Sequence, residues 1–201
     1  MVTGASIAML AALVDKSLLR VTAQKRYEIH ALLQQFAREK LQRSASEEAS
    51  IHAEHGAYFL ALAERAAAEL KRPQREPWLR RIDDDYENLL SALDWATRQG
   101  NGETALRLAG SLWRFWWLRG RYREGRAYLQ RALAYPGAAA PGAARAKALG
   151  GLGVLAWGEA DYVEAQKLFE ESLDGSRKLG DDVGVVGMLN NLAILAHEQG
   201  E

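Results

Sequence analysis

Two histidines spaced one helical turn apart are the first residues of this sequence that could do chemistry. They lie in the run His52-Ala-Glu-His55, and two imidazoles at this spacing on a helix can bind the same metal ion. A closed metal site needs at least a third ligand, and the nearby sequence does not supply one. A solvated polar helix face explains the pair better, so we predict no metal site.

A loose dinucleotide-binding pattern occurs at Gly151-x-Gly153-x-x-Ala156. The glycines of such a pattern hold a pyrophosphate only where a strand precedes them and a helix follows. No strand is expected before Gly151, whereas close packing between helices accounts for both glycines. We therefore predict no bound cofactor.

Three consecutive carboxylates, Asp83 to Asp85, could bind a cation or act as an acid–base pair. They stand just before an apolar stripe that begins at Tyr86, and carboxylates stabilise the positive end of a helix dipole. Neither a histidine nor a nucleophile stands in register with them. We interpret these carboxylates as helix-terminal charges and predict that the chain is not an enzyme.

Two basic clusters with interleaved aromatic residues are candidates for contact with nucleic acid, because arginine binds phosphate and aromatic rings stack on bases. The clusters comprise Lys71, Arg72, Arg75, Arg80 and Arg81 with Trp78, and Arg114, Arg119, Arg121, Arg123, Arg126 and Arg131 with Trp117 and Tyr122. Long basic side chains also cover ordinary helix surfaces. A nucleic-acid-binding fragment that uses these clusters and Arg20, Lys25 and Arg26 is therefore our alternative hypothesis.

The composition indicates a globular domain without a dominant charge. The 201 residues are 48% hydrophobic and 26% charged, and 26 basic residues balance 26 acidic ones. The absence of cysteine excludes disulfides and thiol chemistry and fits a reducing compartment. The apolar run from Ile7 to Val14 is too short to span a bilayer. We expect a cytoplasmic protein that does not bind membranes.

The elements that position these residues are revealed by a recurrence at a spacing of 40 residues. A shift of 40 aligns Leu112, Leu152 and Leu192, then Trp116, Ala156 and Ala196, then Gly120, Ala160 and Gly200. Recurrence of this kind predicts stacked helical units over residues 104–201, with the third unit truncated. The glycines predict the end of the first helix in a unit, because glycine readily adopts positive φ.

The best copy of the unit resembles a tetratricopeptide (TPR) repeat. Leu149-x-x-Leu152-Gly153-x-x-Ala156 is followed by Ala165-x-x-x-Phe169, with Asp161 as the expected cap of the second helix. The resemblance implies a TPR-like superhelix of helix pairs. The usual TPR period is about 34 residues, so each unit here should contain extra helical turns or a longer connection.

A size exchange is expected between the first and second units. Trp113 occupies the position of Gly153, and Gly125 occupies the position of Ala165. We predict that the absent side chain of Gly125 makes room for the Trp113 indole.

The residues before the repeats predict a short helix, a hairpin and further helices. Ser6–Lys16 has helical periodicity, and alternation predicts a hairpin that pairs Leu19 with Ile29, Arg20 with Glu28 and Val21 with Tyr27. A helix ending near Arg43 and a polar hinge at Ser44–Ser50 should follow. Helices at Ile51–Leu70 and Ile82–Arg98 would complete a helical connector over residues 46–103.

Helix, hairpin and helix in this order look like the closing part of a winged-helix domain, assigned to residues 1–45. The fold class we predict is therefore mainly all-α, with one β-hairpin in a partial winged helix ahead of the repeats. The runs Leu10-Ala-Ala-Leu-Val-Asp-Lys-Ser-Leu-Leu19, Tyr27-Glu-Ile-His30, Trp78-Leu-Arg-Arg-Ile82 and Tyr86-Glu-Asn-Leu-Leu90 are similar to STAND regulators. These are multidomain signal-transduction ATPases that include bacterial transcription activators. The chain has no phosphate-binding loop, so the resemblance implies one section of such a protein.

The family pattern implies a concave face, built by the first helix of each unit, that binds a peptide, a protein or an effector. The candidate residues on it are Arg107, Arg114, Trp117, Lys147, Val154, Trp157, Asn190, Asn191, Ile194 and His197. Trp117, Trp157 and His197 share one column and suit an extended ligand with apolar anchors and negative charge. Packing of the two indoles between neighbouring helices is the equally weighted alternative.

The resemblance also implies partners. A protein or peptide, which includes the ATPase module of the same parent chain, would bind the concave face. An unpaired stripe with Leu189, Leu192 and Ala196 could support self-association.

Overall fold

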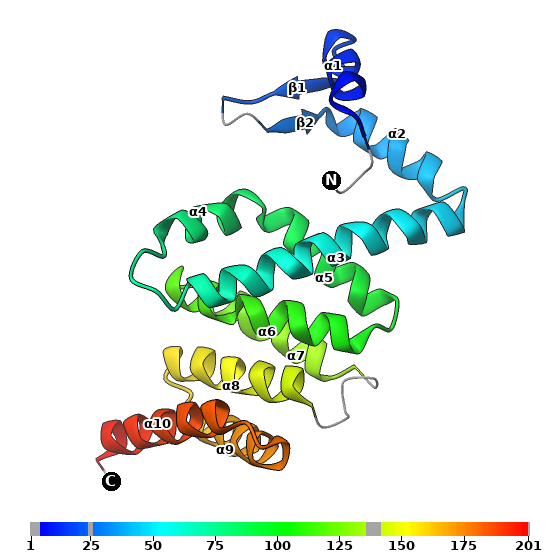
Figure 1. Cartoon of the computed structure of the whole chain (residues 1–201). Helices are drawn as coiled ribbons and strands as arrows, with labels where there is room; N and C mark the ends of the chain where they lie inside the picture. Colours follow the sequence, from blue (N-terminus) through cyan, green and yellow to red (C-terminus); the bar gives the residue numbers. More distant parts are fainter. Residues whose placement is uncertain (1–4, 24–25, 136–141, 201) are drawn as a thin grey trace. The chain divides into compact units, whose positions relative to one another are not determined.

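The computed structural model describes residues 5–23, 26–135 and 142–200 and is mainly helical, as predicted, with one two-stranded sheet (Figure 1). The chain divides into two compact units, Met1–Tyr58 and Phe59–Glu201. The boundary falls inside the helix α3 (Ala45–Glu69). No helix in the described part is both long and apolar enough to cross a membrane.

The first unit contains the predicted hairpin. Strands β1 (Leu19–Val21) and β2 (Tyr27–Ile29) pair in antiparallel fashion, with Arg20 opposite Glu28 in the predicted register. The Arg20 Nε donates to Glu28 Oε2 at 2.7 Å, which stabilises this register on the exposed face. Gln24 and Lys25 of the predicted loop lie outside the described residues.

Helices flank the hairpin on both sides along the chain. Helix α1 (Ile7–Asp15) begins after Ser6, whose Oγ accepts a hydrogen bond from the Met9 amide at 3.1 Å. Helix α2 (Ala31–Leu41) begins after His30, whose Nδ1 accepts from the Leu32 amide at 3.3 Å. The predicted hinge at Ser44–Ser50 is wrong, because α3 already begins at Ala45. Glu47 and Glu48 stand in its first turn, where the helix dipole favours acidic side chains.

The predicted helix Ile82–Arg98 ends at Arg98 as predicted, but its predicted start is wrong. The structure has two helices there, α4 (Glu76–Asp84) and α5 (Tyr86–Arg98), separated at Asp85. Pro77 lies in the first turn of α4, where proline is tolerated, and this moves the helix start upstream of Ile82. Asp83 and Asp84 therefore end a helix instead of beginning one. The Asp85 carboxylate forms an ion pair with Arg81, with Oδ2 at 2.8 Å from Nε.

Among the described residues after position 100, the chain forms five α-helices. They are α6 (Gly102–Leu118), α7 (Tyr122–Leu133), α8 (Ala143–Gly158), α9 (Tyr162–Leu179) and α10 (Asp182–Gln199). Helix α6 packs on α7 and α8, helix α8 packs on α9, and α10 packs on α9 and α8 (Figure 1). The helices of the repeat region thus nest in successive pairs, and the described residues after 100 contain no strand.

The 40-residue spacing, longer than the usual TPR period, has a different cause in each of the two complete repeats. Helix α7 is 12 residues long and ends at Leu133, well before α8 begins at Ala143. Helix α9 is 18 residues long, and α10 begins at Asp182, soon after its end. The first repeat therefore has a longer connection to the next repeat, and the second repeat has extra helical turns. These are the two solutions that the spacing predicted.

In each helix pair, α6 with α7 and α8 with α9, a glycine makes room for a large side chain. In the first pair that side chain is not the one predicted. A Cβ on Gly125 would lie 2.8 Å from Trp116 Cδ2 and 2.6 Å from Leu155 Cδ1, so Gly125 makes room for Trp116 and not for Trp113. In the second pair, a Cβ on Gly153 would lie 2.6 Å from Phe169 Cε1. Each pair therefore combines one large aromatic residue with one glycine, because a close-packed core has no space for both side chains.

The three aligned positions 120, 160 and 200 lie at helix ends, as predicted, and all have positive φ. Gly120 and Gly200 have positive φ angles of 67° and 80°, and Ala160 in the same column has φ 60°. Asp161 precedes α9, as predicted, but its side chain does not cap that helix. The carboxylate instead accepts a hydrogen bond from Arg126 Nη2 at 2.8 Å, because an arginine of α7 lies within reach.

Candidate ligand-binding groove

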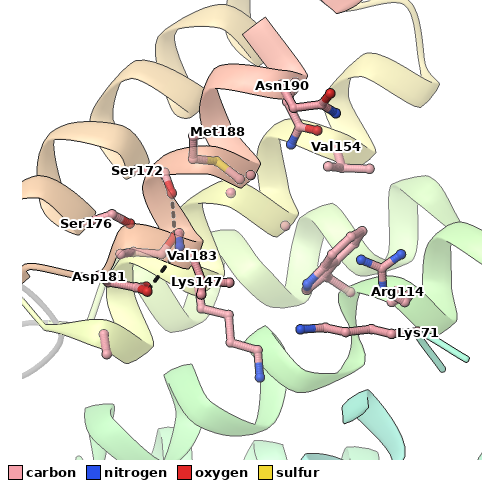
Figure 2. A pocket seen from close by; sticks show the side chains of 18 of the residues that line it. Lys71, Arg114, Lys147, Val154, Ser172, Ser176, Asp181, Val183, Met188 and Asn190 are labelled. Atoms are coloured by element: carbon pink, nitrogen blue, oxygen red, sulfur yellow. Dashed lines mark hydrogen bonds between the residues drawn. The ribbon is translucent and has the colours of Figure 1, made fainter. Parts of the chain in front are cut away.

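A groove of about 580 Å³ runs across α6, α8 and α10, with contributions from α9 and from Lys71 after α3 (Figure 2). Its lining combines indole rings, small residues of α8, and amide and hydroxyl side chains. All these elements belong to the second unit. Clefts of about 300–1,000 Å³ are typical of small-molecule sites, so the volume alone is compatible with a ligand.

Most of the residues predicted for the concave face line this groove. They are Arg114, Trp117, Lys147, Val154, Trp157, Asn190 and Asn191. Arg107 lies instead in an adjoining cavity of about 230 Å³, to which Lys147 also contributes. Ile194 and His197 are exposed and line neither of these two cavities of the described residues. The predicted role of the ten residues in partner binding stays a prediction.

The sequence left two roles open for Trp117 and Trp157, which were packing between helices and lining of the binding face. Trp117 of α6 and Trp157 of α8 stack with ring centroids 5.5 Å apart and planes inclined by 15°. The Trp157 Nε1 donates to Glu198 Oε2 of α10 at 2.6 Å. The rings thus pack between neighbouring helices and also line the groove. His197 does not extend the stack among the described ring contacts, since its side chain is exposed on α10.

A third indole, Trp113, forms another part of the lining. A Cβ on Gly151 would lie 2.6 Å from Trp113 Cγ, so the glycine permits this indole to pack directly on α8. The Arg114 guanidinium carbon lies 4.4 Å from the Trp113 ring centroid, within the range of a cation–π contact. The small residues of α8 therefore serve helix packing, which accounts for the glycine pattern without a dinucleotide.

Three cations, Lys71, Arg114 and Lys147, gather on one side of the groove (Figure 2). The Lys147 Nζ donates to Ser111 Oγ at 3.1 Å, and Ser111 is buried. Among the described residues, no carboxylate lies within 4.0 Å of any of the three charged groups.

Burial lowers the pKa values of two of these cations, Lys147 and Arg114. Desolvation lowers the pKa of the Lys147 ammonium, Lys71 and Arg107 lower it further, and Glu64 opposes the change. Desolvation also lowers the pKa of Arg114, with a smaller effect from Arg75. Glu64 attracts Lys147, but no described carboxylate pairs directly with any of the three cations.

The other basic side chains behave differently. The second predicted cluster is largely neutralised, since Arg119 pairs with Asp83, Arg131 with Asp94, and Arg126 with both Glu159 and Asp161. In the first, Arg72, Arg80 and Arg81 pair with Glu69, Glu76 and Asp85. Paired arginines bind phosphate less readily, because the existing partner must first be displaced. The structure thus gives the nucleic-acid alternative no added support.

Several lining residues were not predicted from the sequence. They are Lys71, Trp113, Ala143, Ala146, Gly150, Gly151, Ser172, Ser176, Asp181, Val183, Gly184, Gly187 and Met188. Met188 stands three positions before Asn191 on α10, and residues three apart share a helix face, so helical spacing could have located part of this set. Lys71 lies outside the 40-residue register, and the sequence carries no signal that brings it to the repeats.

The two histidines of the run His52-Ala-Glu-His55 lie on α3. The His52 and His55 rings are 6.5 Å apart in an edge-on arrangement. The described part of the chain holds no group of three or more side chains suited to a metal ion.

No family model matches the sequence. Two proteins named "Putative HTH-type transcriptional regulator", from Mycobacterium bovis and Mycobacterium tuberculosis, are each 31% identical to it over 190 residues. The match covers 88% of this chain but only 21% of those proteins, so the chain spans about a fifth of the relatives' length. The chain is distantly related to a section of proteins named as transcriptional regulators.

Proposed function

We propose that this chain is the sensing section of a bacterial transcription regulator of the STAND type, in which TPR-like helix pairs bind a ligand in the groove. The observation that carries the proposal is the groove across α6, α8 and α10, since equivalent helices of successive units supply its walls. Distant similarity to transcriptional regulators supports the regulatory role. A regulator of transcription would act in the cytoplasm.

Regulation by such a section requires two states of the parent protein. A groove ligand can shift their equilibrium only if it binds one state more tightly than the other. Contact between the groove and an ATPase module of the same parent would provide that difference, because ligand and module would compete for one surface. The chain itself would perform no catalysis in this mechanism.

Blocking the groove tests the proposal. A Cβ on Gly187 of α10 would have no neighbour within 4 Å, so Gly187→Leu should fill part of the groove without disturbing the fold. Gly56→Leu is a matched control, since Gly56 is also helical and also has open space at its Cβ. Both substitutions would be placed in the longer regulator, and its regulated transcripts would be measured in cells.

The expected result is a changed response for Gly187→Leu and an unchanged one for Gly56→Leu. Equal transcript levels in wild type and Gly187→Leu, with the variant protein present at normal abundance, would contradict a sensing role for the groove.

Self-association through α10 is a second part of the proposal. Val183 and Val186 are 80% and 66% exposed, and Leu189 is 45% exposed, so this helix presents an apolar surface. We expect Val186→Glu to abolish any dimer seen by light scattering, because a charge would be buried in the contact. A dimer that persists in this variant would place the contact elsewhere.

A further inference from the structure

We propose that Lys71, Arg114 and Lys147 form a subsite for the anionic group of a small organic molecule, whose apolar part lies against Trp117, Val154 and Trp157. The inference rests on the proposed function and specifies the chemistry of the groove ligand. A carboxylate, phosphate or sulfonate would satisfy the subsite, since each offers oxygens that accept from ammonium and guanidinium groups.

The first support is that three parts of the chain that are separate in the sequence each contribute one cation to the same side of the groove. Lys71 follows α3, Arg114 belongs to α6 and Lys147 belongs to α8 (Figure 2). Lys71 and Arg107 repel the Lys147 ammonium, Glu64 attracts it, and Arg75 repels the Arg114 guanidinium. Arg107 is already neutralised by Glu64 at 2.7 Å. A bound anion would offset the repulsion that the described protein groups leave.

The second support is that the protein fixes two of these cations in place. The hydrogen bond to Ser111 orients the Lys147 ammonium, and the cation–π contact with Trp113 positions the Arg114 guanidinium. A cation–π contact uses none of the guanidinium N–H groups as conventional donors, so they stay available to a ligand. Fixed donors lose little conformational entropy when a ligand binds.

The distribution of charge favours a small molecule over an acidic peptide. The cations occupy one side of the groove, whereas Ser172, Met188 and Asn190 across from them are uncharged (Figure 2). The groove-lining carboxylate, Asp181, accepts a hydrogen bond from the Gly184 amide at 3.0 Å at the start of α10. An acidic peptide would need cations along its whole length. One anionic group on a neutral body fits the observed lining better.

The test is calorimetric titration of the whole chain with 2-naphthoate and with its neutral isostere, 2-naphthamide. The subsite variant is Lys71→Gln/Arg114→Gln/Lys147→Gln. Its matched control is Arg123→Gln/Lys167→Gln/Lys178→Gln, which removes the same charge from side chains that are 95%, 72% and 67% exposed. Circular dichroism would verify that both variants fold. A hexaglutamate peptide would serve as the polypeptide probe.

We expect naphthoate to bind about tenfold or more tightly than naphthamide, and the subsite variant to lose this preference, because charge-assisted hydrogen bonds would be removed. The control variant should bind as the wild type does. Equal binding of acid and amide, retained preference in the subsite variant, no binding of naphthoate at about 1 mM, or tighter binding of hexaglutamate would each overturn the proposal.

The two proposals fail separately. If Gly187→Leu alters transcription but the subsite variant does not, the groove senses a ligand without this anionic chemistry. If neither variant alters transcription while naphthoate still binds as expected, the subsite exists but the sensing role is wrong.

Discussion

At the scale of single residues, the cations of the groove stand apart from the other basic side chains. Arg126 pairs with Glu159 and Asp161 in the turn between α8 and α9, and Arg131 pairs with Asp94 of α5. Lys147 has a hydroxyl partner instead. A desolvated ammonium beside other cations costs stability, and such costs are typical of positions kept for binding.

Burial of the Lys147 ammonium should lower the stability of the folded chain. The pKa of Lys147 is lower in the folded chain than the value near 10.4 expected when unfolded. Burial and repulsion penalise the charged form in the folded state, and this costs stability at neutral pH because the unfolded side chain is protonated there. Lys147→Gln should therefore raise the free energy of unfolding at pH 7, measured by urea denaturation. Lys178→Gln should give no gain, since Lys178 pairs with Asp174 at 2.6 Å.

The same pKa shift fixes a pH dependence. Between the folded and the unfolded pKa of Lys147, the unfolded chain binds more protons, so this residue makes stability increase with pH. The advantage of Lys147→Gln over wild type should shrink as the pH rises through the folded pKa and vanish above the unfolded value. An advantage that grows with pH would show that the ammonium is stabilised by the groove.

At the scale of elements, the helix ends provide a test of the repeat. Ala160 adopts the left-handed conformation that Gly120 and Gly200 adopt at the equivalent positions. An L-residue with a Cβ is strained there by about 1–2 kcal/mol. Ala160→Gly should therefore stabilise the chain by about 0.5–1 kcal/mol after the larger entropy of unfolded glycine is subtracted.

Gly120→Ala is the matched control for that prediction. A Cβ at Gly120 would have no neighbour within 4 Å, so only backbone strain should contribute. A loss of about 1 kcal/mol is expected in thermal or urea unfolding. Loss of stability in Ala160→Gly would mean that the three positions are not structurally equivalent.

The paired sizes of Gly125 and Trp116 give another prediction. Gly125→Ala should destabilise the chain by about 1–3 kcal/mol through overpacking, despite the better helix propensity of alanine. In the background of Trp116→Leu the same change should cost much less, because the smaller side chain removes one of the two steric conflicts. Additive effects in this double-mutant cycle would contradict direct compensation. Gly175→Ala, with its Cβ at 3.4 Å from Ala146, should be tolerated.

Recurrence and alternation allowed much of the fold to be predicted. The hairpin register followed from alternation, with Arg20 opposite Glu28, and the glycine column located two helix ends. The break at Asp85 was missed, because the apolar pattern continues from Ile82 into Tyr86. The hinge at Ser44–Ser50 was missed because polar residues also occupy exposed helical turns, as Glu47 and Glu48 do.

The groove was only partly predictable. Helical spacing placed Trp117 and Trp157 in one column, and the structure stacks them. Spacing could not predict that Lys71, from outside the repeats, reaches the same groove, since this depends on how α3 packs in three dimensions. The 40-residue spacing also placed His197 in this column, whereas the structure leaves the His197 side chain exposed. A repeat register specifies a position along a helix and not the contacts made there.

At the scale of the whole molecule, the two units differ in burial. The described residues of Met1–Tyr58 include no buried side chain, whereas α6 and α8 contain many, among them Phe115, Trp116 and Leu155. Amides of α1 and α2 should therefore exchange with solvent much faster than those of α6 and α8. Hydrogen-exchange mass spectrometry measures this, and uniform protection along the chain would contradict it.

The most direct test of the account is backbone amide NMR of the whole chain during titration with 2-naphthoate. We expect chemical shifts to change mainly in the groove-lining stretches of α6, α8 and α10 and at Lys71, and we expect Lys71→Gln/Arg114→Gln/Lys147→Gln to abolish these changes. Shift changes concentrated in residues 5–58, or unaffected by the triple substitution, would contradict the claim that this groove binds an anionic ligand.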